Sequence, residues 1–92
     1  MQAELVDAQE MHKKNPDTFE VPSYVTIARI SPGSLVQIAS YGERFWVEVT
    51  RVNQPSYRGR VDNDLLKTDE HGFDFNDSVN FEARHIHKVY HG

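Results

Sequence analysis

The clearest hydrophobic pattern in the chain is a strict alternation between residues 42 and 52, GERFWVEVTRV. Apolar side chains recur at every second position from Phe45 to Val49, which is the period of a β-strand with one buried face. Trp46, the only tryptophan, falls on the opposite, polar face. We therefore expect a strand over residues 44–53 whose two faces have different surroundings.

Shorter apolar runs on both sides of this segment predict further strands and close turns. Gly59 lies inside one of these runs, and a glycine within a strand indicates a bulge or a sharp bend. The segment over residues 64–75 has no clear period and is expected to be a loop. The additional strands are expected over residues 34–40, 57–63, 79–82 and 86–90, with a hairpin turn at Tyr41-Gly42 and one helical turn over 83–85.

The first third of the chain predicts helices. Apolar residues at three- and four-residue spacing, with acids early and lysines late, predict a helix over residues 3–14 that ends at an Asn-Pro pair. A linker with two prolines follows, and Ser23 is a suitable N-cap for a short helix over residues 24–30. A strand is the alternative there, because Val25 and Thr26 are poor helix formers.

Five short strands, close hairpins and a glycine bend predict an α+β fold that is mainly β. We expect a small SH3-like antiparallel barrel preceded by one or two helices, with an open α+β sheet as the alternative. A chain of 92 residues has the length of one domain. Within it we expect residues 1–15 to form the N-terminal helix, 16–33 the linker and short helix, and 34–90 the barrel.

Composition and charge narrow the class of protein. The chain has no cysteine, no apolar run near the roughly 20 residues of a membrane span, and an acidic start without a signal-peptide pattern. We therefore expect a cytoplasmic protein without a membrane association. The net charge of −4 argues against nucleic acid as the main partner, because phosphate contacts dominate that affinity.

Five motifs in combination resemble a known family. They are PDTFEVPS, ISPGSLVQI, GERFWVEVT, GRVDNDLL followed by HGF, and FEARHIHKV, and they span residues 16–89. Together they resemble a family of small uncharacterised bacterial proteins, a resemblance that implies a small β-rich fold and carries no activity. The chain departs from the family pattern at residues 74–78, DFNDS, where a Gly-Asp turn is expected. Asn76 can adopt the left-handed backbone conformation in place of that glycine.

Trp46 has two interpretations. The N-terminal helix or the linker can cover it, because tryptophan buries a large area and a thin domain gains from burying its largest side chain. It can instead remain open as an aromatic platform for a partner. We expect the first arrangement, in which Trp46 joins a second, minor apolar layer beneath the helix and linker.

The acidic segment RVDNDLLKTDEHG offers possible metal ligands, and the candidates are Asp62, Asp64, Asp69, Glu70 and His71. Its spacing lacks the glycine and the closing glutamate of a calcium loop, and no H-E-x-x-H pair is present. A structural role is favoured, in which Asp62, Asn63 and Asp64 bond nearby backbone amides and the two leucines that follow anchor the loop to the core. We therefore expect no metal and no cofactor.

The histidines near the C-terminus offer a further candidate pair. His85 and His87 alternate on the last predicted strand, but a zinc site needs a third ligand that the sequence does not supply. We expect His85, with Arg84, to make surface or loop contacts, and His87 to be solvated.

The arginines offer a possible anion site. Arg58 and Arg60 share one face of a strand, and Arg51 lies on the neighbouring strand. Arginine suits forked hydrogen bonds to phosphate or carboxylate groups. Cross-strand pairing with neighbouring acids is the favoured alternative and needs no ligand.

No catalytic arrangement is evident, since the chain lacks a cysteine nucleophile, a G-x-S-x-G turn and a phosphate-binding glycine loop. We therefore expect a non-enzymatic binding module for a protein partner. The alternatives are a metal-dependent hydrolase using Asp62, Asp64 and His71, and a nucleic-acid binder using the arginine face. The candidate binding surface comprises Trp46, Arg58, Arg60, Asp62, Asn63, Asp64 and His71.

Overall fold

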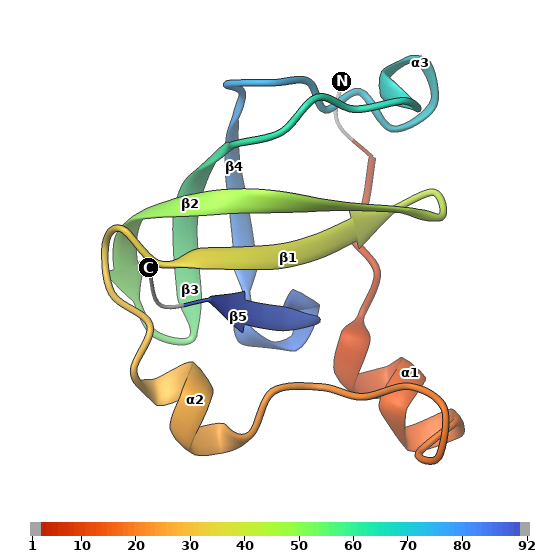
Figure 1. Ribbon diagram of the computed structural model, residues 1–92, viewed down its shortest axis with the longest axis vertical. Coiled ribbons are helices and arrows are strands. Elements are labelled where there is room, and N and C mark those ends of the chain that lie inside the picture. The colour runs from red at the N-terminus through yellow and green to blue at the C-terminus, as the bar shows by residue number, and fades with distance from the viewer. Residues whose placement is uncertain (1–2, 91–92) are drawn as a thin grey trace.

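The computed structural model describes residues 3–90, which form one strongly bent sheet with short helices at its margins (Figure 1). No helix in this range is long and apolar enough to cross a membrane. The elements are, in order, α1 (Ala8–Lys14), α2 (Tyr24–Ala28), β1 (Leu35–Ser40), β2 (Glu43–Asn53), β3 (Ser56–Val61), α3 (Thr68–His71), β4 (Ser78–Glu82), the 3-10 turn η1 (Ala83–His85) and β5 (Lys88–Tyr90).

The sheet is antiparallel throughout, with strand order β4-β3-β2-β1-β5. The predicted hairpin turn is confirmed: Tyr41 and Gly42 have φ values of 50° and 77°, as a two-residue hairpin loop of type I′ requires. In Figure 1, β1 and β2 run side by side while β4 crosses behind them. The mainly-β α+β architecture of five strands is thus confirmed. The sheet remains open between β4 and β5, so closure into a barrel stays a prediction.

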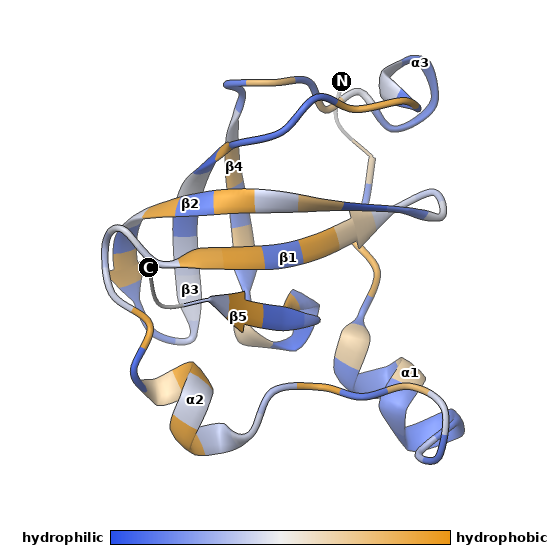
Figure 2. Cartoon of the chain, viewed as in Figure 1, coloured by the Kyte–Doolittle hydropathy of each residue, from blue (hydrophilic) through white to orange (hydrophobic). Residues whose placement is uncertain are grey.

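One face of the sheet forms the core. The alternation expected in β2 is confirmed, because Phe45, Val47 and Val49 are at most 1% exposed. Figure 2 shows the apolar and polar positions alternating along β1 and β2. The predicted last strand begins later than expected, at Lys88, after Ile86 has turned into the core. The remaining buried core side chains come from β1, β3 and β4 and from three segments outside the strands: Val36, Ile38, Tyr57, Val61, Val79, Phe81, Ile30, Phe73 and Ile86.

Gly59 in β3 is required by close packing, and the bulge expected there lies on the partner strand instead. Gly59 pairs with Val49 while the next β3 residue towards the turn pairs with Arg51, so Thr50 of β2 is the extra residue. A Cβ on Gly59 would overlap the Val47 side chain and lie 2.6 Å from the carbonyl oxygen of the next β2 residue. The glycine therefore marks a close approach of two strands.

The N-terminal helix is shorter than the predicted 3–14. Asp7 is its N-cap, and the Asp7 carboxylate accepts a hydrogen bond of 3.0 Å from a backbone N–H of the first turn. Residues 3–6 are extended, and two of their N–H groups donate to the carbonyl oxygens of His71 and Ala39. The apolar spacing at residues 3–6 therefore reflects a segment docked on the body of the domain.

The other differences lie at the ends of elements and in the long loop. The predicted Ser23 cap is confirmed, since its hydroxyl accepts from the N–H of Thr26, but α2 ends at Ala28. The segment over residues 64–75 contains α3, a single turn that is too short for hydrophobic periodicity to reveal. Asn76 has a φ of 73°, the left-handed conformation expected where it replaces glycine.

Replacing Gly59 with alanine should destabilise the protein by about 1–3 kcal/mol, because the added methyl group has no space between β2 and β3. Chemical unfolding of the variant measures this loss. Ser56→Ala, an exposed position of the same strand, serves as the control and should change the stability by about 0.5 kcal/mol or less. Equal stability of the two variants would contradict the close approach.

Candidate functional site

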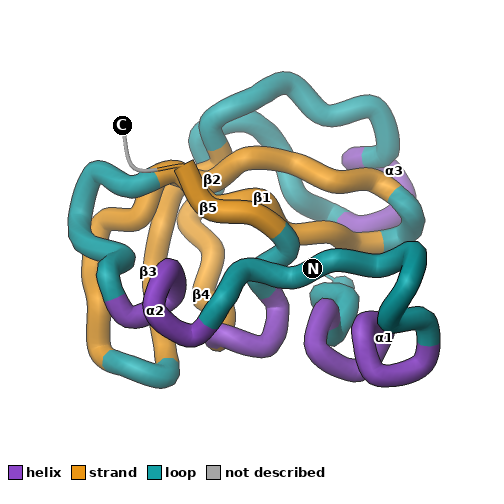
Figure 3. The backbone as a smooth tube through the Cα atoms, turned by 60° about the horizontal axis from the view of Figure 1, so that its bottom comes forward, coloured by secondary structure: helices purple, strands orange, loops and turns teal. Residues whose placement is uncertain are grey.

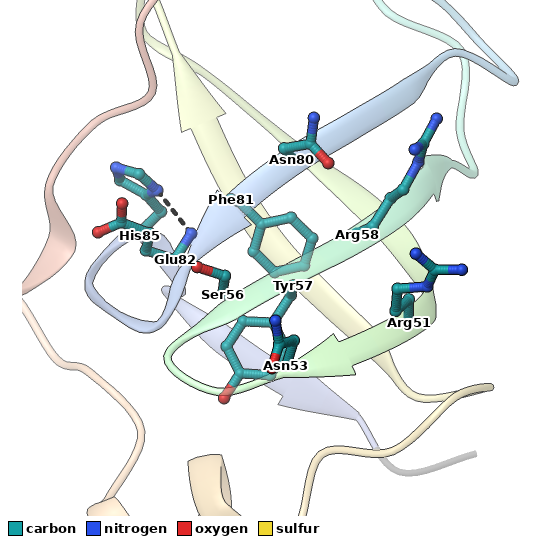
Figure 4. Close-up of a pocket in the computed structure, with 9 residues that line it drawn as sticks. All are labelled: Arg51, Asn53, Ser56, Tyr57, Arg58, Asn80, Phe81, Glu82 and His85. Atoms are coloured by element: carbon teal, nitrogen blue, oxygen red, sulfur yellow. Dashed lines mark hydrogen bonds between the residues drawn. The ribbon is translucent and has the colours of Figure 1, made fainter.

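The outward face of the sheet carries most of the exposed candidate residues. The register places Arg51 of β2, Arg58 of β3 and Asn80 of β4 side by side across three strands. The next row holds Asn53 and Ser56 together with Glu82, and all six residues are exposed. With Tyr57, Phe81 and His85 these side chains line a pocket of about 400 Å³ (Figure 4). We call this the arginine pocket.

Two positive charges face each other in the arginine pocket. Arg51 and Arg58 are directly opposite in the register, an arrangement that destabilises a sheet when both groups are charged. Among residues 3–90, neither guanidinium has an ion pair or a hydrogen bond. The acid in the pocket is already engaged, since Glu82 accepts from Arg84 at 2.9 Å. The bulge at Thr50 creates this opposition, because regular pairing beyond Val49 and Gly59 would place Thr50 opposite Arg58.

Arg60 behaves as the sequence predicted. Its guanidinium donates to the Glu48 carboxylate at 2.7 Å and to the side-chain oxygen of Asn76 at 2.9 Å. The expectation of cross-strand pairing is therefore confirmed for Arg60 and wrong for Arg51 and Arg58. Figure 4 shows the latter two on one side of the pocket, with His85 and Glu82 on the other.

Trp46 is half-buried, and the predicted cover of helix and linker lies elsewhere. Helix α1 packs mainly against η1. The linker places Phe19 against Arg44 and the ring of His87, along the side of the sheet that carries β5 (Figure 3). Trp46 instead shares a pocket of about 290 Å³ with three other side chains, Leu35, Asp62 and Tyr90. We call this the tryptophan pocket.

The start of the acidic loop is fixed to the backbone of Trp46. The side-chain oxygen of Asn63 accepts from the N–H of Trp46 at 2.6 Å, and the backbone N–H of Asp62 donates to the Trp46 carbonyl at 2.9 Å. The Asn63 amide group also donates to the carbonyl of Asp64 at 2.8 Å. The loop-shaping role predicted for Asn63 is confirmed. The same role predicted for Asp62 and Asp64 is wrong, because both residues are exposed and neither carboxylate accepts a hydrogen bond within residues 3–90.

The two leucines that follow behave differently from each other. Leu65 packs against the core, as expected of an anchor. Leu66 is 93% exposed, so its predicted anchoring role is wrong. The end of the loop is held instead by hydrogen bonds to the carboxylate of Glu43.

His71 is a structural residue bound to Glu43. Its ring is 0% exposed, and its Nδ1 accepts from the N–H of Phe73 at 3.1 Å. The proton of the neutral ring therefore sits on Nε2, which donates to Glu43 at 2.9 Å. The same carboxylate accepts from the backbone N–H groups of Leu66 at 2.7 Å and Lys67 at 2.8 Å. Partial burial opposes ionisation, but these hydrogen bonds hold the pKa of Glu43 below its usual value.

The candidate metal ligands are not brought together. Within the described part of the chain, no group of three histidine, cysteine, aspartate or glutamate side chains could hold a metal ion. Both ring nitrogens of His71 are already bonded inside the protein. A hydrolase that uses Asp62, Asp64 and His71 therefore finds no support in this geometry.

His87 is buried, which corrects the prediction of a solvated side chain. It is 3% exposed, and neither ring nitrogen has a hydrogen-bond partner within residues 3–90. Phe19 contacts its ring edge-on, with centroids 5.2 Å apart. Burial lowers the pKa of His87 to about 4, and the charges of Arg44 and His85 act in the same direction. Phe19, 68 residues away in the sequence, covers part of this ring, and strand alternation could not reveal such a contact.

Comparison with known proteins yields no relative. No family model matches the chain, and neither a curated protein nor a solved structure resembles it significantly.

The variant Glu43→Gln should destabilise the protein by about 1–3 kcal/mol at neutral pH. In the wild type both carboxylate oxygens accept hydrogen bonds, from two backbone N–H groups and from the His71 ring. In the variant, the NH₂ group replaces one of these oxygens and leaves at least one donor without an acceptor. Thermal unfolding measures the loss. Glu70→Gln, an exposed acid in α3, is the control and should be nearly neutral. Equal melting temperatures for the two variants would show that the three hydrogen bonds do not hold the loop.

His87 should make the protein acid-sensitive. Its pKa is about 4 in the folded state and about 6.5 in the unfolded state, so unfolding takes up a proton between these values. The stability contributed by the neutral ring is fully present above pH 6.5 and is lost as the pH falls towards 4. His87→Leu, which removes no hydrogen bond, should flatten melting temperature against pH in this window. An unchanged pH profile would contradict the burial of His87.

Proposed function

We propose that this protein is a non-enzymatic binding module that recognises an acidic segment of a protein partner at the arginine pocket. The observation that carries the proposal is the opposed pair Arg51 and Arg58, neither of which has an ion-pair partner among the described residues. Two adjacent guanidinium groups provide several donors in fixed directions and match the oxygens of a carboxylate.

The polar surroundings of the pair suit a peptide. Asn53, Ser56 and Asn80 line the same pocket and can donate to or accept from a peptide backbone. The pair lies on strands, so its position is fixed before binding and less conformational entropy is lost. A carboxylate bound between the two guanidinium groups would also relieve their mutual repulsion.

A protein partner fits the charge distribution better than nucleic acid. The chain is acidic overall, with six acids and one lysine between residues 62 and 77. Nucleic-acid affinity comes largely from many phosphate contacts, and the uncompensated positive charge of the arginine pocket is limited to two side chains.

We also propose that the bent sheet, with η1 linking its two edge strands, is an SH3-like barrel. We propose further that the protein is cytoplasmic, as its lack of cysteine suggests.

A random peptide display library selected on the immobilised protein tests the proposal. Wild-type protein should enrich peptides rich in aspartate and glutamate, and the double variant Arg51→Glu/Arg58→Glu should bind the selected peptides at least about tenfold more weakly. Arg29→Glu, which reverses an exposed arginine at the end of α2 without an ion pair among residues 3–90, is the matched control. It should leave binding unchanged.

Two results would overturn this function. One is the absence of any acidic preference among the enriched peptides, or binding that survives the double charge reversal. The other is tighter binding of a single-stranded oligonucleotide than of any selected peptide, with an affinity that falls steeply with salt. That result would favour the nucleic-acid alternative.

A further inference from the structure

The tryptophan pocket lies on the same outward face as the arginine pocket and has a different chemistry. Leu35 of β1 is opposite Tyr90 of β5, and Trp46 is its diagonal neighbour on β2. Asp62 follows β3, and its backbone hydrogen bond to Trp46 keeps the two residues adjacent. The pocket is therefore lined by two aromatic side chains, one aliphatic side chain and one carboxylate.

The polar groups of this pocket are unoccupied by the protein itself. Asp62 is exposed and has no ion pair or side-chain hydrogen bond among residues 3–90. In the same part of the chain, the indole N–H of Trp46 has no acceptor. Tyr90 is 61% exposed. A buried tryptophan usually satisfies its N–H, so this ring is placed as a wall of a binding surface.

Aromatic faces beside a carboxylate attract organic cations. The ring quadrupole of tryptophan or tyrosine favours a positive charge over its face, and a nearby carboxylate adds a direct attraction. Leu35 provides an apolar wall for the methylene groups of such a ligand. Asp62 is the charged residue that lines the pocket, so an anion would be repelled.

The other charges of this face are engaged or lie outside the pocket. Glu48, opposite Leu35, is paired with Arg60. Arg44 donates to Gln37 at 3.4 Å and lies over the ring of Phe19. Lys88 is opposite Gln37 on this face and does not line the pocket.

We propose that the tryptophan pocket binds the ammonium group of a lysine side chain of the partner. This inference rests on the proposed function, because it takes the occupant from a protein. The ion pair of Glu48 and Arg60 lies in the same cross-strand row as Leu35 and Tyr90, and the opposed arginines lie in the next outward row. A single segment that carries a lysine and, further along, an acidic stretch would match both charges of the face.

Titration of Trp46 fluorescence with Nα-acetyl-lysine amide at constant ionic strength tests the inference, since the chain has one tryptophan. A saturable change is expected, with a dissociation constant on the order of millimolar for so small a probe. The side-chain-acetylated analogue has the same stem without the charge and should bind at least about tenfold more weakly. Equal responses to the two probes would overturn the proposal.

Variants locate the site on the outward face. Asp62→Asn should weaken binding of the lysine amide roughly three- to tenfold, whereas Asp64→Asn, an exposed acid two residues away that does not line the pocket, should not change it. Tyr90→Leu should weaken it similarly, with circular dichroism confirming an unchanged fold. An Asp62→Asn variant that binds as tightly as wild type would overturn the proposal.

Two further arms separate the possible outcomes. Choline binding at least tenfold tighter than the lysine amide would assign the pocket to a free quaternary ammonium ligand and overturn the lysine assignment. The variant Arg51→Glu/Arg58→Glu should retain lysine-amide binding while losing acidic peptides. Failure of the lysine probe alone would therefore reject this inference, and failure of the acidic peptides alone would reject the proposed function.

Discussion

The carboxylate of Glu43 is the interaction on which the arrangement of the long loop depends. It stands at the start of β2 and accepts three hydrogen bonds from residues 66–71, which are far away in sequence. The carbonyl oxygen of His71 in turn accepts a hydrogen bond from the backbone N–H of Ala3, in the N-terminal segment. One ionised group thus joins the central hairpin, the loop after β3 and the start of the chain. Because the loop begins at Asp62, the same contact stabilises the segment that completes the tryptophan pocket.

A second constraint is the close packing of β2 and β3 at Gly59. The bulge beside it shifts the pairing by one residue and brings Arg51 opposite Arg58. This local irregularity therefore decides which side chains share the outward face. Without it the sheet would place a threonine opposite Arg58 and would avoid the repulsion between two arginines. The geometry that distinguishes this face follows from one extra residue in one strand.

The sequence predicted the features that depend on local pattern. The alternation in β2, the Tyr41-Gly42 turn, the Ser23 cap and the η1 turn are all set by neighbouring residues, and each is confirmed. Features set by distant contacts were missed. Phe19 of the linker covers part of the His87 ring, and one of the two ring hydrogen bonds of His71 is made to Glu43.

The sequence identified most residues of the candidate site, but not which of them lie next to one another. Arg58, Arg60, Trp46 and Asp62 were named from the sequence, but strand register decides their partners, and a bulge cannot be placed from a glycine alone. Arg60 forms an ion pair with Glu48. Arg58 lies opposite Arg51, a residue that the predicted binding surface did not include. The predicted surface did include His71, but this residue is buried and cannot be part of a surface.

The outward face combines two features that a purely structural surface has no need of. An opposed arginine pair raises the free energy of the unbound protein, and a half-buried tryptophan with an unbonded N–H contributes less to stability than a covered one would. A carboxylate bound between the two guanidinium groups would relieve their repulsion, so part of its affinity would come from removal of an unfavourable interaction in the free domain. The strands fix the backbone positions of both arginines before binding, so the ordering cost is confined to their exposed side chains.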